Sequence, residues 1–346
     1  MKRTLALTLA LAMVLSLAAC GGGDKPAAGS GESSGSAGGL STSGSASIPE
    51  ASEPDKSVEP DKSEAPDKSE QPAASQPQQP SKPAVPAEMT YTFDAATGTL
   101  TCSGGGEIKS SDYIDVIKNT IFETNEKKCK QAIKKVVIEN GVTAIGGGAF
   151  YDLAITEIAV PDSVTQIGNE AFKNTPITSV TIPDSVTELG GSIFEGCENL
   201  SSATLPKNLT SIPNSIFRSC TSLTGIQIPE GMTAIEDSAF AYSGLTSITI
   251  PDGVTSLGSW TFAACPITQI TIPASVTILW YDTLADCESL TDVTFLGDTD
   301  MDHVNNWVGN FLKKPVTIHA PAGSVIEGYV NRQIAENGVK CKFVAN

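Results

Sequence analysis

The sequence predicts an α/β repeat solenoid, a rod of stacked coils whose strands form a parallel ladder. A motif related to Ile-Pro-Asp-Ser-Val-Thr returns every 22 or 23 residues, in seven copies. Each copy also carries apolar residues three, six and eleven positions after its proline site. A period of about 20–50 residues is typical of solenoids, because one coil cannot bury its apolar side chains without a neighbour.

The seven copies fall within residues 133–296, and their register is regular. The proline site is occupied by Glu139, Pro161, Pro183, Pro206, Pro229, Pro251 and Pro273. The residues eleven positions later are Phe150, Phe172, Phe194, Phe217, Phe240, Phe262 and Leu284. We therefore expect Phe217 and Phe240 to be buried in the centres of inner coils.

One copy shows how a coil is built. Alternation of apolar and polar residues over Leu245–Ile250 predicts a strand. Pro251-Asp252-Gly253 predicts a turn, because proline presets φ and the next two residues suit a tight bend. Val254 and Leu257 then return to the core. Stacking places equivalent strands about 4.8 Å apart in a parallel ladder.

The segments at both ends of the solenoid are predicted to be caps that cover its open core. Residues 89–132 predict an N-terminal cap, with a hairpin from Tyr91 to Cys102 and a helix capped by Ser111. Residues 297–346 predict a C-terminal cap. There Ser324 would cap a helix that lies between two strands and ends at Asn337-Gly338.

Residues 1–20 predict a secretory signal. Lys2 and Arg3 precede an apolar run, Leu5–Leu17, that is shorter than the roughly 18 residues of a membrane span. Leu17-Ala18-Ala19-Cys20 resembles a bacterial lipobox, which implies lipid attachment at Cys20 and a membrane anchor. The alternative is an ordinary signal peptide with a chance cysteine.

Residues 21–88 form a low-complexity segment rich in Gly and Ser, then in Pro, Glu and Lys. Pro-Asp-Lys-Ser begins at Pro54, Pro60 and Pro66. Because it holds few large aliphatic residues, this segment cannot bury enough apolar surface to fold. We expect a disordered linker between the membrane and the solenoid.

From about Thr90 to Asn346 the chain resembles the BspA-type leucine-rich repeats of bacterial surface proteins. The resemblance rests on the recurring Ile-Pro-Asp-Ser/Gly-Val-Thr and Ala-Phe pairs. It implies a surface or secreted protein, of a kind several times implicated in adhesion, and brings no catalytic residue to this chain. Glu139, Trp280 and Leu284 depart from the pattern in the outer copies.

Two surfaces are candidates for partner binding. The first is a polar, nearly uncharged face on the predicted strands, expected to be concave. Its outward residues are Thr181, Thr204, Gln227, Thr249, Thr271 and Thr294, flanked by Thr178, Ser201, Thr224, Thr246, Thr268 and Thr291. It could be a docking plane for a protein or glycan, but β-branched polar residues also simply suit an exposed strand.

The second surface is aromatic. Trp260, Trp280 and Tyr281 fall at bends where other copies carry Gly, Ser or Asn. These rings could stack on a sugar or contact a partner. The alternative is packing against the C-terminal cap with Trp307.

Four cysteines share one repeat position, fourteen after the proline site. They are Cys197, Cys220, Cys265 and Cys287. A disulfide ladder or a metal strip is conceivable, but parallel side chains on stacked coils favour free, buried thiols. The two histidines, His303 and His319, have no metal-ligand spacing, so neither a metal nor a cofactor is predicted.

The leading functional hypothesis is a lipid-anchored cell-surface protein that mediates protein interaction or adhesion without catalysis. The net charge of −17 and the lack of a basic stripe argue against nucleic acid as a partner. One alternative is a surface lipoprotein that binds a glycan or small ligand. A more distant one is an enzyme acting on the cell envelope.

Overall fold

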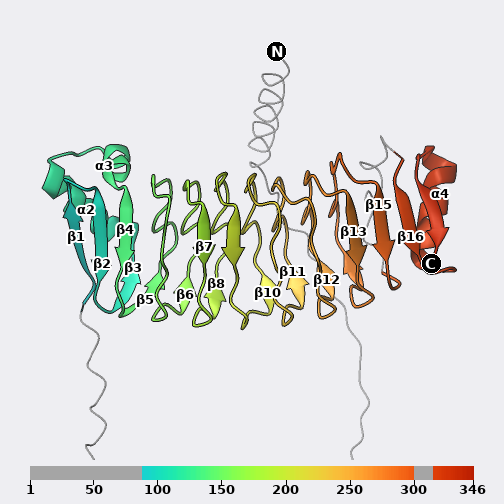
Figure 1. Cartoon of the computed structure of the whole chain (residues 1–346), viewed down its shortest axis with the longest axis horizontal. Coiled ribbons are helices and arrows are strands. Elements are labelled where there is room, and N and C mark those ends of the chain that lie inside the picture. The colour runs from blue at the N-terminus through green and yellow to red at the C-terminus, as the bar shows by residue number, and fades with distance from the viewer. Residues whose placement is uncertain (1–87, 300–314) are drawn as a thin grey trace, which may run out of the picture. The chain divides into compact units, whose positions relative to one another are not determined.

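The computed structural model describes residues 88–299 and 315–346. Over this range the chain forms a solenoid in which successive coils pair side by side (Figure 1). The predicted signal segment with Cys20, most of the predicted linker, His303 and Trp307 lie outside the described residues. None of the helices in the described range is long and apolar enough to cross a membrane.

The N-terminal hairpin is confirmed, and its second strand starts the first of two ladders in the solenoid. Strand β1 (Thr90–Asp94) pairs antiparallel with β2 (Thr99–Ser103). Strand β2 then pairs in parallel with β4 (Lys135–Ile138), while β3 (Gly106–Ile108) pairs with β5 (Val142–Ile145).

Two helices, α2 (Ser110–Ile121) and α3 (Glu126–Ala132), follow this hairpin. The prediction that Ser111 caps the first helix is wrong, because the extended backbone of β3 continues to Lys109 and the helix starts directly after it. The hydroxyl of Ser111 donates instead to Asp112. Helix α3 has a side-chain cap, since Asn125 accepts a hydrogen bond from the backbone N–H of Lys128.

The coils contribute to two strand ladders, where the sequence suggested one. The first ladder holds strands that precede the proline site: β7 (Ser179–Thr181), β9 (Ser202–Thr204), β13 (Gln269–Ile272) and β15 (Asp292–Phe295), in addition to β2 and β4. The second ladder holds strands that follow it: β6 (Gln166–Ile167), β8 (Glu188–Leu189), β10 (Ser211–Ile212), β11 (Ala234–Ile235), β12 (Ser256–Leu257) and β14 (Ile278–Leu279), in addition to β3 and β5.

The second ladder is interrupted between β8 and β10, and the first ladder between β4 and β7 and again between β9 and β13. The predicted strand Leu245–Ile250 is therefore wrong as a strand, although the Thr246 N–H still donates to the Thr224 carbonyl 3.1 Å away. The interruption between β9 and β13 includes Gly225, and a glycine inside a strand weakens it because it adds backbone entropy and no packing. The segment Leu245–Ile250 thus has no regular strand beside it in the preceding coil.

The C-terminal elements agree with the sequence. Strand β16 (Thr317–Ala320) extends the first ladder from β15, and β17 (Lys342–Ala345) pairs with β16. Helix α4 (Val325–Asn337) lies between them in sequence. Its Ser324 cap is confirmed, since the side chain accepts from the Glu327 N–H, and Gly338 ends the helix with φ +62°.

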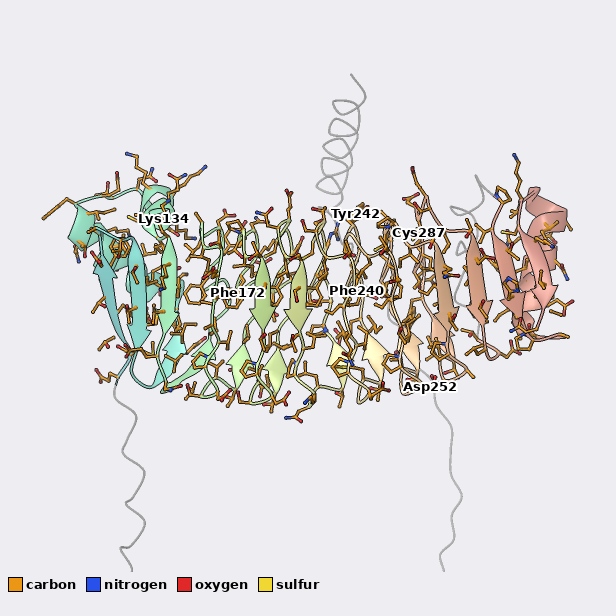
Figure 2. The ribbon with its side chains drawn as sticks, viewed as in Figure 1. Lys134, Phe172, Phe240, Tyr242, Asp252 and Cys287 are labelled. Carbon is orange, nitrogen blue, oxygen red and sulfur yellow. The ribbon has the colours of Figure 1, made fainter. Side chains whose placement is uncertain are left out.

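A column of aromatic rings runs through the core. The phenylalanines eleven positions after each proline site are fully buried, so the prediction for Phe217 and Phe240 is confirmed. Ring centroids of neighbouring coils lie 5.4–5.8 Å apart, and Tyr113 extends the column at its N-terminal end. Figure 2 shows Phe172 and Phe240 inside the coils, with Tyr242 and Asp252 at opposite edges.

Candidate functional site

The predicted polar face lies on the first ladder. Thr181 pairs with Thr204 across β7 and β9, and Thr271 pairs with Thr294 across β13 and β15. Gln227 and Thr249 lie in the irregular stretch between these blocks. The exposed members are Thr181, Thr204, Gln227, Thr249 and Thr271, whereas Thr294 is half-buried. We call these six residues the threonine row.

Side chains of the threonine row make no hydrogen bond to any other described residue. The flanking hydroxyls behave differently. Ser201, Thr246 and Thr291 each donate to the carbonyl of the preceding coil, at 3.0–3.2 Å. The flanking residues therefore hold adjacent coils together, while the row itself presents unused polar groups to solvent.

Charge appears at the C-terminal end of this face. His319 on β16 pairs in register with Thr294, and its Nε2 lies 3.5 Å from Asp292 Oδ1. Within the described residues, no group of three His, Cys, Asp or Glu side chains could hold a metal ion.

The predicted aromatic surface borders a hollow over the second ladder. Its volume is about 470 Å³, within the range of roughly 300–1,000 Å³ common for small-molecule sites. Four consecutive coils supply its lining: Asn214, Ala234, Ile235, Glu236, Asp237, Ser256, Gly258, Ser259, Trp280 and Tyr281. We call this feature the aromatic hollow.

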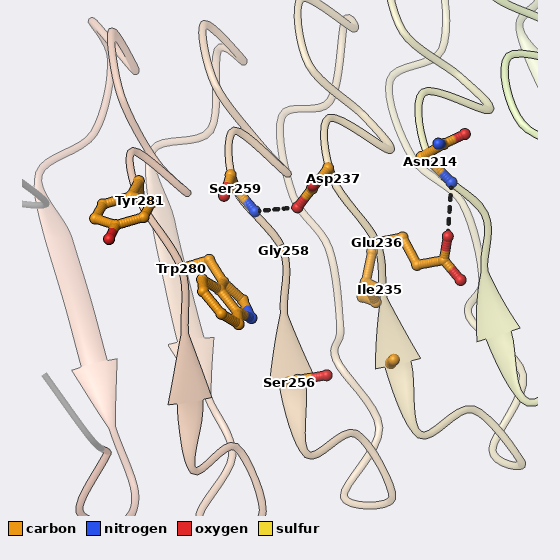
Figure 3. Close-up of a pocket in the computed structure, with 10 residues that line it drawn as sticks. Asn214, Ile235, Glu236, Asp237, Ser256, Gly258, Ser259, Trp280 and Tyr281 are labelled. Atoms are coloured by element: carbon orange, nitrogen blue, oxygen red, sulfur yellow. Dashed lines mark hydrogen bonds between the residues drawn. The ribbon is translucent and has the colours of Figure 1, made fainter. Parts of the chain in front are cut away.

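An aromatic wall borders the hollow on one side. The Trp280 and Tyr281 ring centroids lie 6.4 Å apart at an angle of 56°. In Figure 3 the indole extends over the neighbouring coil toward Gly258, which has no side chain to fill that space. Small residues such as Ala234 and Ser256 line the hollow beyond it.

Two carboxylates line the other side of the hollow and are held by the backbone. Glu236 accepts hydrogen bonds from the Ser211 hydroxyl at 2.8 Å and the Asn214 N–H at 3.2 Å. Asp237 Oδ1 accepts from the Ser259 N–H at 2.7 Å (Figure 3). Among the salt bridges within the described chain, none includes either carboxylate. Both are thus fixed in place, and no base in the described part of the chain neutralises them.

Trp260 does not line this hollow, although the sequence grouped it with Trp280 and Tyr281. It occupies a different repeat position, nine after the proline site, where the backbone is left-handed with φ +60°. Its N–H donates to the Tyr281 carbonyl at 3.0 Å. The structure therefore brings together two of the three predicted aromatic residues. The predicted contact with Trp307 lies outside the described residues.

Sequence reasoning missed the acidic side of the hollow. Glu236 occupies the position seven after the proline site, where Gly146, Gly168, Gly190 and Gly258 stand in four other coils. A glutamate at a repeat position that is usually glycine was the signal in the sequence. It indicates a site only together with the structure, which shows that Trp280, at the same position two coils later, lines the same hollow.

The four repeat cysteines occupy buried coil corners, as predicted. Each thiol donates to the carbonyl of a core phenylalanine in the preceding coil, as Cys220 does to Phe194 at 3.2 Å. Loss of hydration raises the pKa of Cys265 to about 11 and that of Cys287 to about 12. These thiols therefore stay protonated and serve as core residues.

We expect these thiols to resist iodoacetamide in the folded protein at pH 8 and to react quickly in 6 M guanidinium without a reductant. The thiolate is the reactive species, and burial lowers both its population and its access. Mass spectrometry of alkylated peptides measures this. Half-buried Cys341 serves as the internal control, and labelling of Cys220 as fast as Cys341 would contradict the burial.

Comparison with known proteins agrees with the repeat architecture. The family model described as the BspA type leucine rich repeat region matches residues 115–243 and 210–303, with six copies. No curated protein matches the chain.

Several solved structures are similar to the chain. A leucine-rich repeat protein from Bacteroides ovatus ATCC 8483 shows 20% identity and a TM-score of 0.48, with coverage of 68% of this chain and 71% of that one. One from Eubacterium ventriosum ATCC 27560 shows 22% identity, a TM-score of 0.44, and coverage of 68% and 77%. A leucine rich cell surface protein from Faecalibacterium prausnitzii A2-165 shows 23% identity, a TM-score of 0.34, and coverage of 48% and 58%.

The family match covers more than half of the chain and coincides with the coils seen in the structure. Proteins built from such repeats are typically non-catalytic scaffolds for protein interaction. This chain belongs to the BspA-type leucine-rich repeat family.

Proposed function

We propose that this protein is anchored by lipid to the outer face of a bacterial cell membrane and binds a protein partner through the threonine row. The observation that carries the proposal is the row itself. It presents polar, uncharged side chains without described partners along successive coils, while neighbouring hydroxyls are used between coils. Such a face suits a partner that lies across several coils.

The chemistry of the row also indicates how binding would behave. Threonine and glutamine carry no charge, so long-range steering is weak and the affinity depends little on salt. Each contact contributes modestly to the binding free energy. Several anchored copies that engage one target would add avidity without any new contact.

The triple change Thr204→Arg, Gln227→Arg and Thr249→Arg is expected to weaken partner binding at least about tenfold, through bulk and unmatched charge. A suitable measurement is biolayer interferometry, after the partner is identified by cross-linking on intact cells. The matched control is Thr143→Arg, Thr210→Arg and Thr277→Arg, which changes exposed threonines at another repeat position. Equal affinity of the first triple variant and the wild type would reject the row.

Membrane anchoring has its own test at Cys20. The support is the lipobox-like Leu17-Ala18-Ala19-Cys20, followed by a long low-complexity segment. Cys20→Ala is expected to release the protein into the medium or to leave it unprocessed. Cell fractionation and intact-mass analysis measure both outcomes. A mature wild-type protein without added lipid mass would contradict the anchor.

Glycan binding is a second candidate function, favoured by one specific observation. The aromatic hollow combines an exposed indole with fixed carboxylates, and it lies on the second ladder, apart from the threonine row.

A further inference from the structure

We propose that the aromatic hollow is a saccharide-binding site, which takes neutral or amino sugars and excludes sugars that carry carboxylates. The proposal goes beyond protein binding by the threonine row, because it uses the opposite strand ladder and different residues. Either site can be wrong without the other.

The aromatic wall supplies the stacking surface. Trp280 is 40% exposed and Tyr281 is 42% exposed, so both rings present apolar surface to solvent beside the hollow. Four other coils fold with glycine at the position of Trp280, so the indole is not required by the repeat. A broad exposed ring beside a hollow suits the C–H face of a pyranose, which is apolar and flat.

The polar lining identifies a hydroxylated ligand. The carboxylates of Glu236 and Asp237 are acceptors only, whereas the Ser256, Ser259 and Tyr281 hydroxyls can both donate and accept. An ammonium or guanidinium group only donates, so it would leave the donors of these hydroxyls unused. A sugar hydroxyl both donates and accepts, and neighbouring hydroxyls on one ring can use both kinds of group.

The carboxylates also set the charge selectivity. One Asp237 oxygen accepts from the Ser259 backbone, and the carboxylate retains lone pairs for a ligand. Two acids without a basic partner among the described residues repel uronic and sialic acids, while they tolerate neutral sugars and attract protonated amino sugars.

The test begins with a printed glycan array that holds neutral, amino and acidic oligosaccharides, probed with the full chain. The strongest binder is then titrated by calorimetry against single variants. Trp280→Gly removes the wall and Asp237→Asn removes a charge. The chain itself carries Gly258 and Asn214 at these repeat positions, so both replacements suit the coil. Trp260→Ser is the matched control, since Ser238 shares its position and Trp260 does not line the hollow.

We expect a neutral or amino oligosaccharide to bind, with Kd about tenfold higher or more for Trp280→Gly and about fivefold higher for Asp237→Asn. Trp260→Ser should keep Kd within about twofold, and circular dichroism should match the wild type for all variants. The proposal is overturned if the array shows no neutral or amino binder, if the strongest binder is acidic, or if Trp280→Gly retains full affinity. Loss of glycan binding only in the threonine-row triple variant would also overturn it, and would leave the row as the binding surface.

Discussion

Replacing Phe217 with alanine is expected to lower the free energy of unfolding by about 3–5 kcal/mol, and Phe240→Ala should have a similar effect. Phe217 is fully buried, and its ring lies 5.6 Å from both Phe194 and Phe240. Truncation removes apolar burial and leaves a cavity between two coils that hydrogen bonds hold at fixed spacing. The cost is large because neighbouring coils cannot close that cavity independently.

Urea unfolding of the chain, followed by circular dichroism, measures this effect. Thr249→Ala is a suitable control, because this exposed side chain should change stability by less than about 0.5 kcal/mol. A loss below about 1 kcal/mol at both phenylalanines would show that the aromatic column does not hold the coils together.

The second large effect is expected at Gly190. A Cβ added there would lie 2.4 Å from the Asn169 backbone nitrogen and 2.7 Å from the Gly168 carbonyl carbon. These are main-chain atoms of the preceding coil and cannot rotate away. Gly190→Ala should therefore cost about 1–3 kcal/mol, by forcing two coils apart.

Gly225→Ala is the matched control, since a Cβ added at Gly225 meets no atom within 4 Å. It should be neutral or raise stability by up to about 1 kcal/mol, through reduced entropy of the unfolded chain. The same urea titration compares the two variants. Equal stability of both alanine variants would mean that coil spacing at Gly190 is looser than the structure shows.

The repeat register could be predicted because each apolar position recurs in seven copies along the sequence. Phe217 and Phe240 were correctly placed in the core, and Ser324 was correctly placed as a helix cap. Each depends on local spacing alone. The break in the first ladder between β9 and β13 could not be predicted in the same way, since Leu245–Ile250 has the alternation of a strand and still lacks regular pairing.

The aromatic hollow was harder to predict, because it depends on which repeat positions meet across different coils. Trp260 and Tyr281 are joined by a backbone hydrogen bond, yet only Tyr281 lines the hollow. The left-handed backbone at Trp260 is shared by its equivalents in every coil. These are Gly148, Glu170, Ser192, Ser215, Ser238 and Asp282. A periodic pattern identifies core positions, whereas the direction of an exposed side chain depends on backbone angles that it does not encode.

The similar core packing of successive coils has an evolutionary consequence. Because each inner Phe, from Phe172 to Phe240, meets an equivalent Phe on both sides, a duplicated or deleted unit of 22 residues rejoins core surfaces of matching shape. Recombination between similar coding segments would then alter the number of coils at little cost to folding. Natural length variants should gain or lose coils before Asn214, since an insertion between Asn214 and Tyr281 would divide the aromatic hollow.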